Sequence, residues 1–212
     1  MATECEKSFI SAWDSKFKKD VAHQQFDKYS IRKLDEFISL LPKNAKILDA
    51  GCGAGEKTNY LLSKGIDAIG VDSSKTAIAF ARKNFSRTRF RVAHVEKLPF
   101  ENNSFDAVLS IAVLHCLLEP SRKAYVKELH RVLRKDGLLY LLTLSAEDET
   151  IDKSERLEEN SFRQKSGILF HLSTESELRQ VFKSFNIAEL RHMKRKHKGK
   201  TVAVFILIAN KK

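Results

Sequence analysis

A run of alternating glycines and two aspartates are the residues of this sequence whose types and spacing could do chemistry. The segment from Asp49 to Gly55 reads DAGCGAG. Glycine has no Cβ, so a ligand can approach the backbone closely at such a turn. A dinucleotide fingerprint, GxGxxG, would need its third glycine at position 56, where this chain has Glu56. The spacing therefore indicates a ligand-binding turn and argues against NAD, with a purely structural tight turn as the alternative.

The second aspartate, Asp72, ends the segment GVD, 23 residues after Asp49. In nucleotide-binding α/β domains, an acid at this place accepts hydrogen bonds from both hydroxyls of a ribose. The alternative is a carboxylate that caps the helix predicted to begin near Ser73 and Ser74. A glycine turn at the same predicted sheet edge favours the ribose interpretation.

The elements that must position these residues alternate between strand and helix. Apolar periodicity predicts strands at 46–50, 67–71, 89–95, 105–112 and 138–144, and helices at 31–41, 56–64, 74–84 and 121–134. Ser30 is expected to cap the first helix, and Thr174 opens a capping box for a helix at 174–183. Strands at 187–193 and 201–209 follow, joined by a polar loop. Such alternation predicts an α/β fold, a doubly wound and mostly parallel sheet with helices on both faces.

Composition limits the remaining possibilities. The chain has 212 residues, of which 42% are hydrophobic, with three prolines and eight glycines, so we expect one globular domain over 1–212 and no collagen-like or low-complexity segment. The longest apolar run, 202–209, is too short to cross a bilayer, and the first residues lack a secretory signal, so a cytoplasmic protein is expected. Cys5, Cys52 and Cys116 show no CxxC spacing, which predicts reduced thiols and no metal site.

Four segments together resemble the Rossmann-like, class I methyltransferases that depend on S-adenosylmethionine, and in particular the methyltransferase type 11 group. They are ILDAGCGAG at 47–55, GVDSS at 70–74, VEKLPFENNSFDAVLSIAVLH at 95–115 and ELHRVLRKDGLLYL at 128–141. The resemblance implies a seven-stranded sheet whose last strand is antiparallel. It also implies S-adenosylmethionine as the cofactor, S-adenosylhomocysteine as its product, and methyl transfer by direct displacement.

The same resemblance implies roles for individual residues. Asp49 and the loop from Gly51 to Gly55 would surround the methionine part of the cofactor, and Asp72 would hold the ribose. His94 stands where many relatives have the Asp that meets adenine, so this contact departs from the family pattern. The implied cofactor-binding residues are Asp49, Gly51, Cys52, Gly53, Gly55, Asp72, Ser73, His94, Val95, Glu96 and Ser110.

His115 is the candidate catalytic residue, because it follows the fourth strand, where the family often opens its acceptor pocket. A histidine there could remove a proton from the acceptor, since its ordinary pKa lies near neutrality. The alternative is a histidine that packs at the end of a strand. Methyl transfer does not require a base, because alignment and proximity can supply most of the acceleration. Residues 111–113 are interpreted as part of the pocket wall.

Two further segments are expected to cover the pocket. Residues 1–29 contain Trp13, Phe17 and Tyr29 and are interpreted as an N-terminal lid, with ordinary core aromatics as the alternative. Residues 146–172 are interpreted as an insertion over the acceptor site. Its part from 147 to 159 holds seven acids and two bases, which suits a cationic acceptor or is simply a solvated face.

The acceptor is the least defined part of the interpretation. The segments SIAVLHCL and RVLR are similar to transfer-RNA wobble-uridine methyltransferases, whereas the short chain also looks like small-molecule enzymes of the thiopurine and tellurite type. A small-molecule acceptor is favoured. Transfer RNA is the alternative, and a non-catalytic cofactor-binding partner subunit is a further one. A monomer or a homodimer is expected.

The net charge of +11 is concentrated in two short segments. Residues 191–200 and 211–212 together carry +8, because they hold eight Lys or Arg and no acid, which leaves +3 for the other 200 residues. The segment 191–200 is predicted to form a basic loop beside the acceptor opening. It would either recruit an anionic substrate or offset the acidic insertion.

Overall fold

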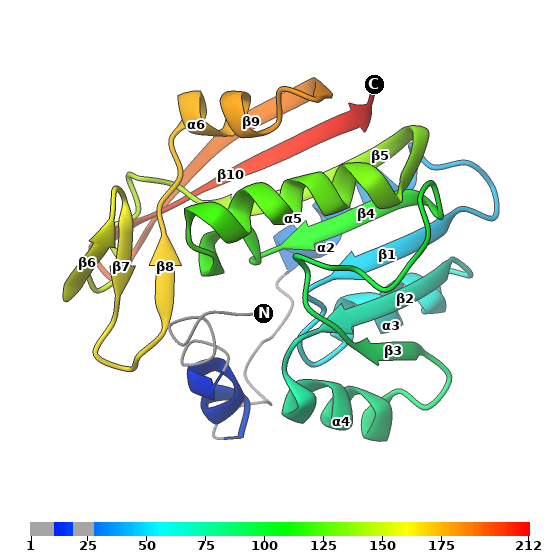
Figure 1. The fold of residues 1–212 in the computed structure, drawn as a ribbon, viewed down its shortest axis with the longest axis horizontal. Coiled ribbons are helices and arrows are strands. Elements are labelled where there is room, and N and C mark those ends of the chain that lie inside the picture. The colour runs from blue at the N-terminus through cyan, green and yellow to red at the C-terminus, as the bar shows by residue number, and fades with distance from the viewer. Residues whose placement is uncertain (1–10, 19–27) are drawn as a thin grey trace.

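The computed structural model describes residues 11–18 and 28–212. A seven-stranded sheet forms its centre, with strand order β3-β2-β1-β4-β5-β10-β9 (Figure 1). The first five of these strands run parallel, and β10 is antiparallel to both of its neighbours, as predicted. The strands are β1 (Lys46–Ala50), β2 (Asp67–Asp72), β3 (Arg89–Val92), β4 (Phe105–Ile111), β5 (Leu133–Leu144), β9 (Phe185–His197) and β10 (Lys200–Lys211).

Helices cover both faces of this sheet. Their bounds are α2 (Lys28–Ile38), α3 (Glu56–Ser63), α4 (Lys75–Asn84), α5 (Glu119–Val132) and α6 (Glu175–Val181), with a 3₁₀ turn η2 at Leu114–Cys116 and a helical segment at residues 11–18. On one face, α2 and α3 bury Phe37 and Leu61 against Tyr140. On the other face, α5 and α6 bury Leu129 and Leu178 in a larger core. None of the described helices is long and apolar enough to cross a membrane.

The predicted elements are found, with differences at their ends. Helix α2 begins at Lys28, so Ser30 lies inside the helix and is not its N-cap. Strand β3 ends at Val92 because its neighbour β2 ends at Asp72, which is the last residue in their register. Helix α5 begins two residues earlier than predicted, since a proline fits the first turn of a helix. The N-cap at Thr174 is confirmed.

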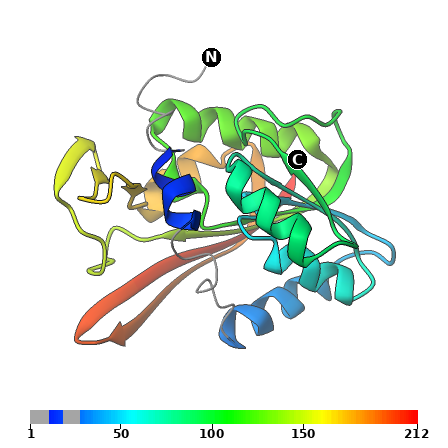
Figure 2. The same ribbon diagram turned by 90° about the horizontal axis from the view of Figure 1, so that it is seen from below.

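The last two strands correct the prediction of a basic loop. Strands β9 and β10 pair along their whole length, and the turn between them consists of Lys198 and Gly199. Both turn residues have positive φ, 48° and 78°, as a two-residue hairpin turn requires. Most of the segment 191–200 is therefore strand, in an arm that extends beyond the rest of the sheet (Figure 2).

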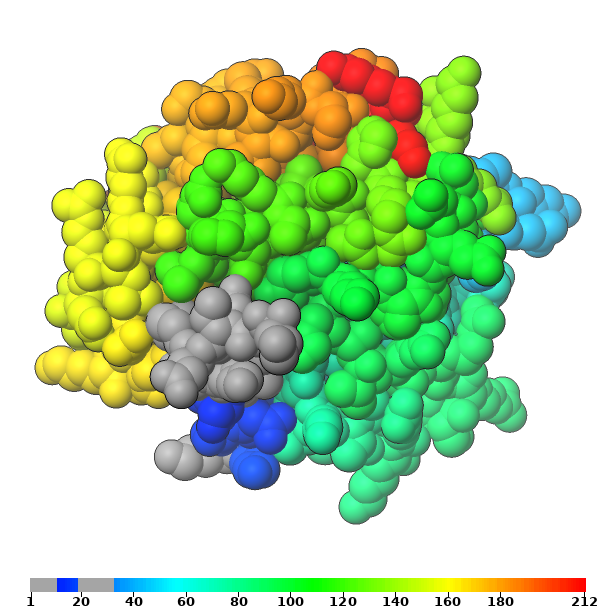
Figure 3. Space-filling view, in the orientation of Figure 1, coloured from blue at the N-terminus to red at the C-terminus, as the bar shows by residue number. Residues whose placement is uncertain are grey.

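The insertion predicted at 146–172 forms a small sheet of its own. It contains β6 (Glu155–Glu158), β7 (Ser161–Arg163) and β8 (Leu169–His171), which pair antiparallel in that order. Strand β8 contacts η2, which follows β4. In the space-filling view this sheet lies beside α5 and the segment 11–18 (Figure 3). The insertion therefore stands at the edge of the main sheet where the parallel strands end.

Candidate active site

A cavity of about 180 Å³ opens beyond the carboxyl ends of the parallel strands. In a doubly wound sheet this is the edge at which ligands bind. Eight of the residues predicted to meet the cofactor line it. They come from the loops that follow β1, β2 and β3, namely Gly51, Cys52, Gly53, Asp72, Ser73, His94, Val95 and Glu96.

The loop after β1 is held by backbone hydrogen bonds. The N–H groups of Gly51 and Cys52 both donate to the carbonyl of Val71, over 2.8 and 2.9 Å. Gly51 has φ +81°, and a Cβ placed on it would lie 2.2 Å from the Cγ2 atom of Val113. A side chain at position 51 would therefore be strained and would also collide with the opposite wall of the cavity.

Asp72 is fixed in place by two backbone donors. The N–H of Gly53 donates to Oδ2 over 2.9 Å, and the N–H of Ser74 donates to Oδ1 over 2.8 Å. Burial raises the pKa of this carboxyl, and the hydrogen bonds from Ser74 and Gly53 oppose that rise. The N-cap of α4 is Ser74, whose hydroxyl accepts from the N–H of Ala77. Asp72 therefore binds the glycine loop to the end of β2 and faces the cavity.

Three of the predicted cofactor residues lie behind the cavity wall. Asp49 is 1% exposed, accepts a 2.7 Å hydrogen bond from the Thr58 hydroxyl, and has a pKa raised by burial. Ser110 is fully buried and accepts from the hydroxyl of Tyr125. Gly55 is the N-cap of α3 with φ +86°. These three residues lie behind the residues that line the cavity and do not line it themselves.

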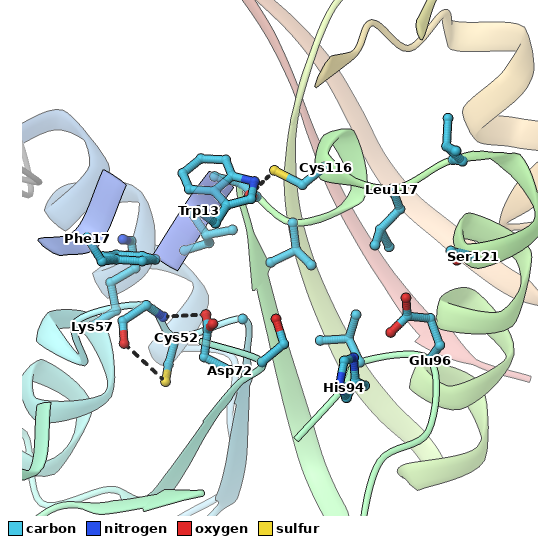
Figure 4. Close-up of a pocket in the computed structure, with 18 residues that line it drawn as sticks. Trp13, Phe17, Cys52, Lys57, Asp72, His94, Glu96, Cys116, Leu117 and Ser121 are labelled. Atoms are coloured by element: carbon cyan, nitrogen blue, oxygen red, sulfur yellow. Dashed lines mark hydrogen bonds between the residues drawn. The ribbon is translucent and has the colours of Figure 1, made fainter. Parts of the chain in front are cut away.

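The segment 11–18 forms one side of the cavity, and Phe17 lies near Lys57 and Cys52 (Figure 4). Trp13 and Phe17 line it, and the interpretation of residues 1–29 as a lid stays a prediction. Between them, Asp14 accepts hydrogen bonds from the hydroxyls of Ser74 and Thr76, the latter over 2.8 Å. This part of the lid is thus attached directly to the start of α4. The side chain of Tyr29 and residues 1–10 and 19–27 lie outside the described residues.

Comparisons with known proteins agree with this arrangement. Residues 48–141 match the sequence model of a methyltransferase domain family. A solved S-adenosylmethionine-dependent methyltransferase from Methanosarcina mazei superposes with a TM-score of 0.70 at 26% identity, covering 82% of this chain and 96% of that one. The segment 48–141 is therefore a methyltransferase domain, and S-adenosylmethionine-dependent methyltransferases are among the relatives and structural neighbours of this chain. S-adenosylmethionine is the cofactor of this family.

Two curated members of this methyltransferase family differ in what their names say they modify. Malonyl-[acyl-carrier protein] O-methyltransferase of Enterobacter lignolyticus is 34% identical over 128 residues, which is 59% of this chain and 50% of that protein. A tRNA (carboxymethyluridine(34)-5-O)-methyltransferase of Xenopus tropicalis is 35% identical over 136 residues, which is 62% of this chain and 21% of that protein. The present chain thus spans half or less of the length of these curated relatives.

The methyltransferase cavity also contains residues that the sequence analysis did not single out. Lys57 follows the glycine loop on α3, and Leu117, Leu118 and Ser121 follow η2. Cys116 also lines the cavity, whereas its sequence context predicts only a reduced thiol. Their position directly after the first and fourth strands was the available signal. The residues 111–113 line the cavity as predicted.

His115 does not line the cavity. Its ring is 5% exposed, lies 5.7 Å from the ring of Phe170 between centroids, and accepts a hydrogen bond at Nδ1 from the N–H of Leu144. Burial lowers the pKa of His115 to about 3, so the ring is neutral near pH 7. The geometry favours the packing alternative over the hypothesis of a catalytic base.

Two acids of the insertion are paired with cations of the basic segment, outside the cavity. Glu147 contacts Lys194 over 2.6 Å, and Glu149 contacts Lys196 over 3.5 Å. None of the seven acids between 147 and 159 is among the described residues that line the cavity. Two cations of the basic segment therefore offset the acidic insertion, which is one of the two roles predicted for that segment.

Proposed function

We propose that this chain binds S-adenosylmethionine in the cavity and transfers its methyl group to a small-molecule acceptor by direct displacement. The observation that carries the proposal is the placement of Asp72, a carboxylate held by the amides of Gly53 and Ser74 at the mouth of a glycine turn. A carboxylate fixed in this way is oriented before any ligand arrives, which lowers the entropic cost of binding ribose hydroxyls.

Different residues around the cavity would contact different parts of the cofactor. Asp72 would accept hydrogen bonds from the ribose, and the loop from Gly51 to Gly53 would lie against the methionine part. His94 and Val95 would flank the adenine, from the loop after β3. The cofactor, when bound, supplies a methyl group on a positively charged sulfur. Asp49 and Ser110 are proposed to support this surface from behind it.

The protein's contribution to the reaction is proposed to be alignment and exclusion of water. Trp13 and Phe17 close the cavity over the glycine loop, and the apolar residues at the end of β4 form its floor. Holding two reactants in an attack geometry can supply about 7–11 kcal/mol of a barrier. A buried, neutral His115 is given no role in proton transfer.

A small acceptor is favoured over transfer RNA by the charges around the site. Lys194 and Lys196, which belong to the most basic segment, are engaged by Glu147 and Glu149. These pairs reduce the positive charge that the segment presents to a polyanion, and nucleic-acid affinity depends largely on such charge. The cavity itself is covered by the segment 11–18, which suits an acceptor that fits inside.

Calorimetry with S-adenosylhomocysteine tests the cofactor assignment. Wild-type protein should bind it, and Asp72→Ala should weaken binding by about 10-fold or more, equivalent to about 1.4 kcal/mol. Asp67→Ala, at the exposed start of the same strand, is the matched control and should leave the affinity unchanged. Circular dichroism checks that each variant is folded. A folded wild-type protein that does not bind would contradict the proposal.

A labelled-methyl transfer assay tests the acceptor. Protein and labelled S-adenosylmethionine are incubated with a metabolite extract and, in parallel, with total RNA. Label in a small molecule supports the proposal, and label in transfer RNA alone reverses the choice of acceptor. Cofactor binding with no transfer to either pool would point to a non-catalytic partner subunit.

A further inference from the structure

The segment 11–18 places a buried hydrogen-bond donor at one side of the cavity. The indole nitrogen of Trp13 is buried, and it has no hydrogen-bond partner among the residues that the structure describes. Trp13 lines the cavity, and the nitrogen-bearing edge of its ring is turned toward Cys116, which lines the cavity too (Figure 4). A buried donor without a partner costs about 1–3 kcal/mol. A ligand with an acceptor atom at this place would remove that cost.

A positive charge lies beside this donor. The ammonium of Lys16 is 4.6 Å from the centroid of the Trp13 ring. Burial raises the pKa of the Cys116 thiol to about 12, and the nearby charge of Lys16 acts against that rise. The thiol is therefore uncharged near pH 7. This end of the cavity presents an indole N–H and a neutral thiol, and the exposed Lys16 places a positive charge beside the indole ring without lining the cavity.

No proton-accepting side chain faces this end of the cavity in the described part of the chain. His115 lies behind the wall against Phe170, and none of the carboxylates between 147 and 159 lines the cavity. Three side chains that could accept a proton do line the cavity, Asp72 at the end of β2 and His94 and Glu96 after β3, and all three are on the side proposed to bind the cofactor. An acceptor that must lose a proton before attack would have no group here to take it, and the nearby charge of Lys16, which acts on Cys116, would disfavour an ammonium group.

We propose that the methyl acceptor is a small, largely apolar molecule whose nucleophilic group is already anionic at neutral pH, a thiolate or a carboxylate, and that the Trp13 indole N–H donates a hydrogen bond to that group. Trp13 is then a specificity-determining residue, and Lys16 adds a favourable charge. This inference rests on the proposed methyltransferase function and names the substrate class of the same site.

The transfer balances without a base. A lone pair on the anionic sulfur or oxygen forms the new bond to the methyl carbon. The bond between that carbon and the sulfonium sulfur breaks, and its electron pair stays on the sulfur as a neutral thioether. The acceptor becomes a neutral methyl thioether or methyl ester, and no proton moves. The product has lost the charge that Trp13 and Lys16 attracted, which favours its release.

A panel of acceptors on one benzene skeleton tests the substrate class. Thiophenol, benzoate, phenol and benzylamine are each incubated with the full chain and S-adenosylmethionine at pH 7, and S-adenosylhomocysteine formation is measured. We expect turnover of thiophenol, benzoate or both, and none of phenol or benzylamine. Preferred turnover of phenol or benzylamine would overturn the inference. Turnover of none of the four, by protein that binds S-adenosylhomocysteine, would overturn it as well.

The role of Trp13 is tested with a variant that keeps the ring and removes the donor. Trp13→Phe should raise the KM of the anionic acceptor about 10-fold, while kcat and the Kd for S-adenosylhomocysteine stay within about two-fold. Ser11→Ala, an exposed position on the same helical segment, is the control and should change none of the three. An unchanged KM in Trp13→Phe, or an equal rise in the Kd for S-adenosylhomocysteine, would contradict the hydrogen bond. Loss of S-adenosylhomocysteine binding in the wild type would instead contradict the proposed function.

Discussion

The two walls of the cavity are built in different ways. The wall proposed to bind the cofactor, called here the cofactor wall, is local: Asp72 at the end of β2 accepts a hydrogen bond from the N–H of Gly53, 19 residues earlier, in the loop after β1. The wall on the side proposed for the acceptor, which includes Trp13, Cys116 and Leu117, is called the acceptor wall, and it joins distant parts of the chain. Asp14 bonds to Thr76, 62 residues later, and Arg122 bonds to Glu158, 36 residues later. The cofactor wall therefore depends on backbone conformation, whereas the acceptor wall depends on contacts between side chains that are far apart in the sequence.

A buried ionic network holds the acceptor wall together. The guanidinium of Arg122 lies 2.7 Å from Glu158 on β6 and 3.4 Å from Glu177 on α6. It also donates to the carbonyl of Leu117, which lines the cavity. Glu177 in turn contacts the ring of His171 on β8 over 2.8 Å. The insertion, α5 and α6 are thus linked at one side chain that is 6% exposed.

The largest expected effect therefore comes from Arg122→Met. Removing one member of a buried ionic network leaves its partners without compensation, and we expect the free energy of unfolding to fall by about 3 kcal/mol. Urea denaturation measures it, and Arg179→Gln, whose pair with Glu175 is exposed, should change stability by less than about 0.5 kcal/mol. The KM of the acceptor should rise more than the Kd for S-adenosylhomocysteine. An equal loss of cofactor affinity would show that the two walls are not separable.

The cofactor wall is tested at two glycines that share a backbone conformation. Gly51 and Gly65 both have positive φ, 81° and 78°, but a Cβ would collide with Val113 at the first and meet nothing within 4 Å at the second. Gly65→Ala should cost about 1 kcal/mol of stability from the positive φ alone, and Gly51→Ala should cost more, because its Cβ also collides with Val113. Gly51→Ala should also weaken S-adenosylhomocysteine binding about 100-fold, or about 2.7 kcal/mol. Calorimetry showing the same affinity in both variants would mean that backbone strain alone matters.

The sequence predicted the cofactor wall because its signals are local. Glycines at 51, 53 and 55 and an acid at 72 report backbone conformations and strand ends that neighbouring residues determine. The strands themselves follow from apolar periodicity, and the hairpin from two apolar runs. The turn of this hairpin was predicted to be longer than it is, because the charged residues before it belong to a paired strand that projects into solvent. Lysines are in fact common on edge strands, where they discourage pairing with another chain.

The acceptor wall could not be derived from sequence in the same way. Nothing in the segment 147–159 indicates that Glu158 pairs with Arg122 or Glu147 with Lys194, because these contacts depend on how the insertion packs. The burial of the His115 ring could not be predicted either, because it also depends on a tertiary contact. Phe170, which covers its ring, lies 55 residues further along the chain. A histidine after a strand has the right chemistry for a base, but the tertiary surroundings decide its protonation.

His115 therefore gives the smallest of the three effects. Its folded pKa of about 3 lies below the ordinary value of 6.5, so the unfolded chain binds one more proton between these values. Stability is then greatest above pH 6.5 and is lost as the pH falls, by about 2 kcal/mol between pH 7 and pH 5 from this group. His115→Gln, which keeps an acceptor for the Leu144 N–H, should lack that part of the decline in urea denaturation, whereas His197→Gln on the exposed end of β9 should retain it. If His115→Gln instead removed a titration from the pH profile of kcat/KM and left the stability curve unchanged, His115 would be a base reached by the acceptor, and the acceptor wall would take part in proton transfer.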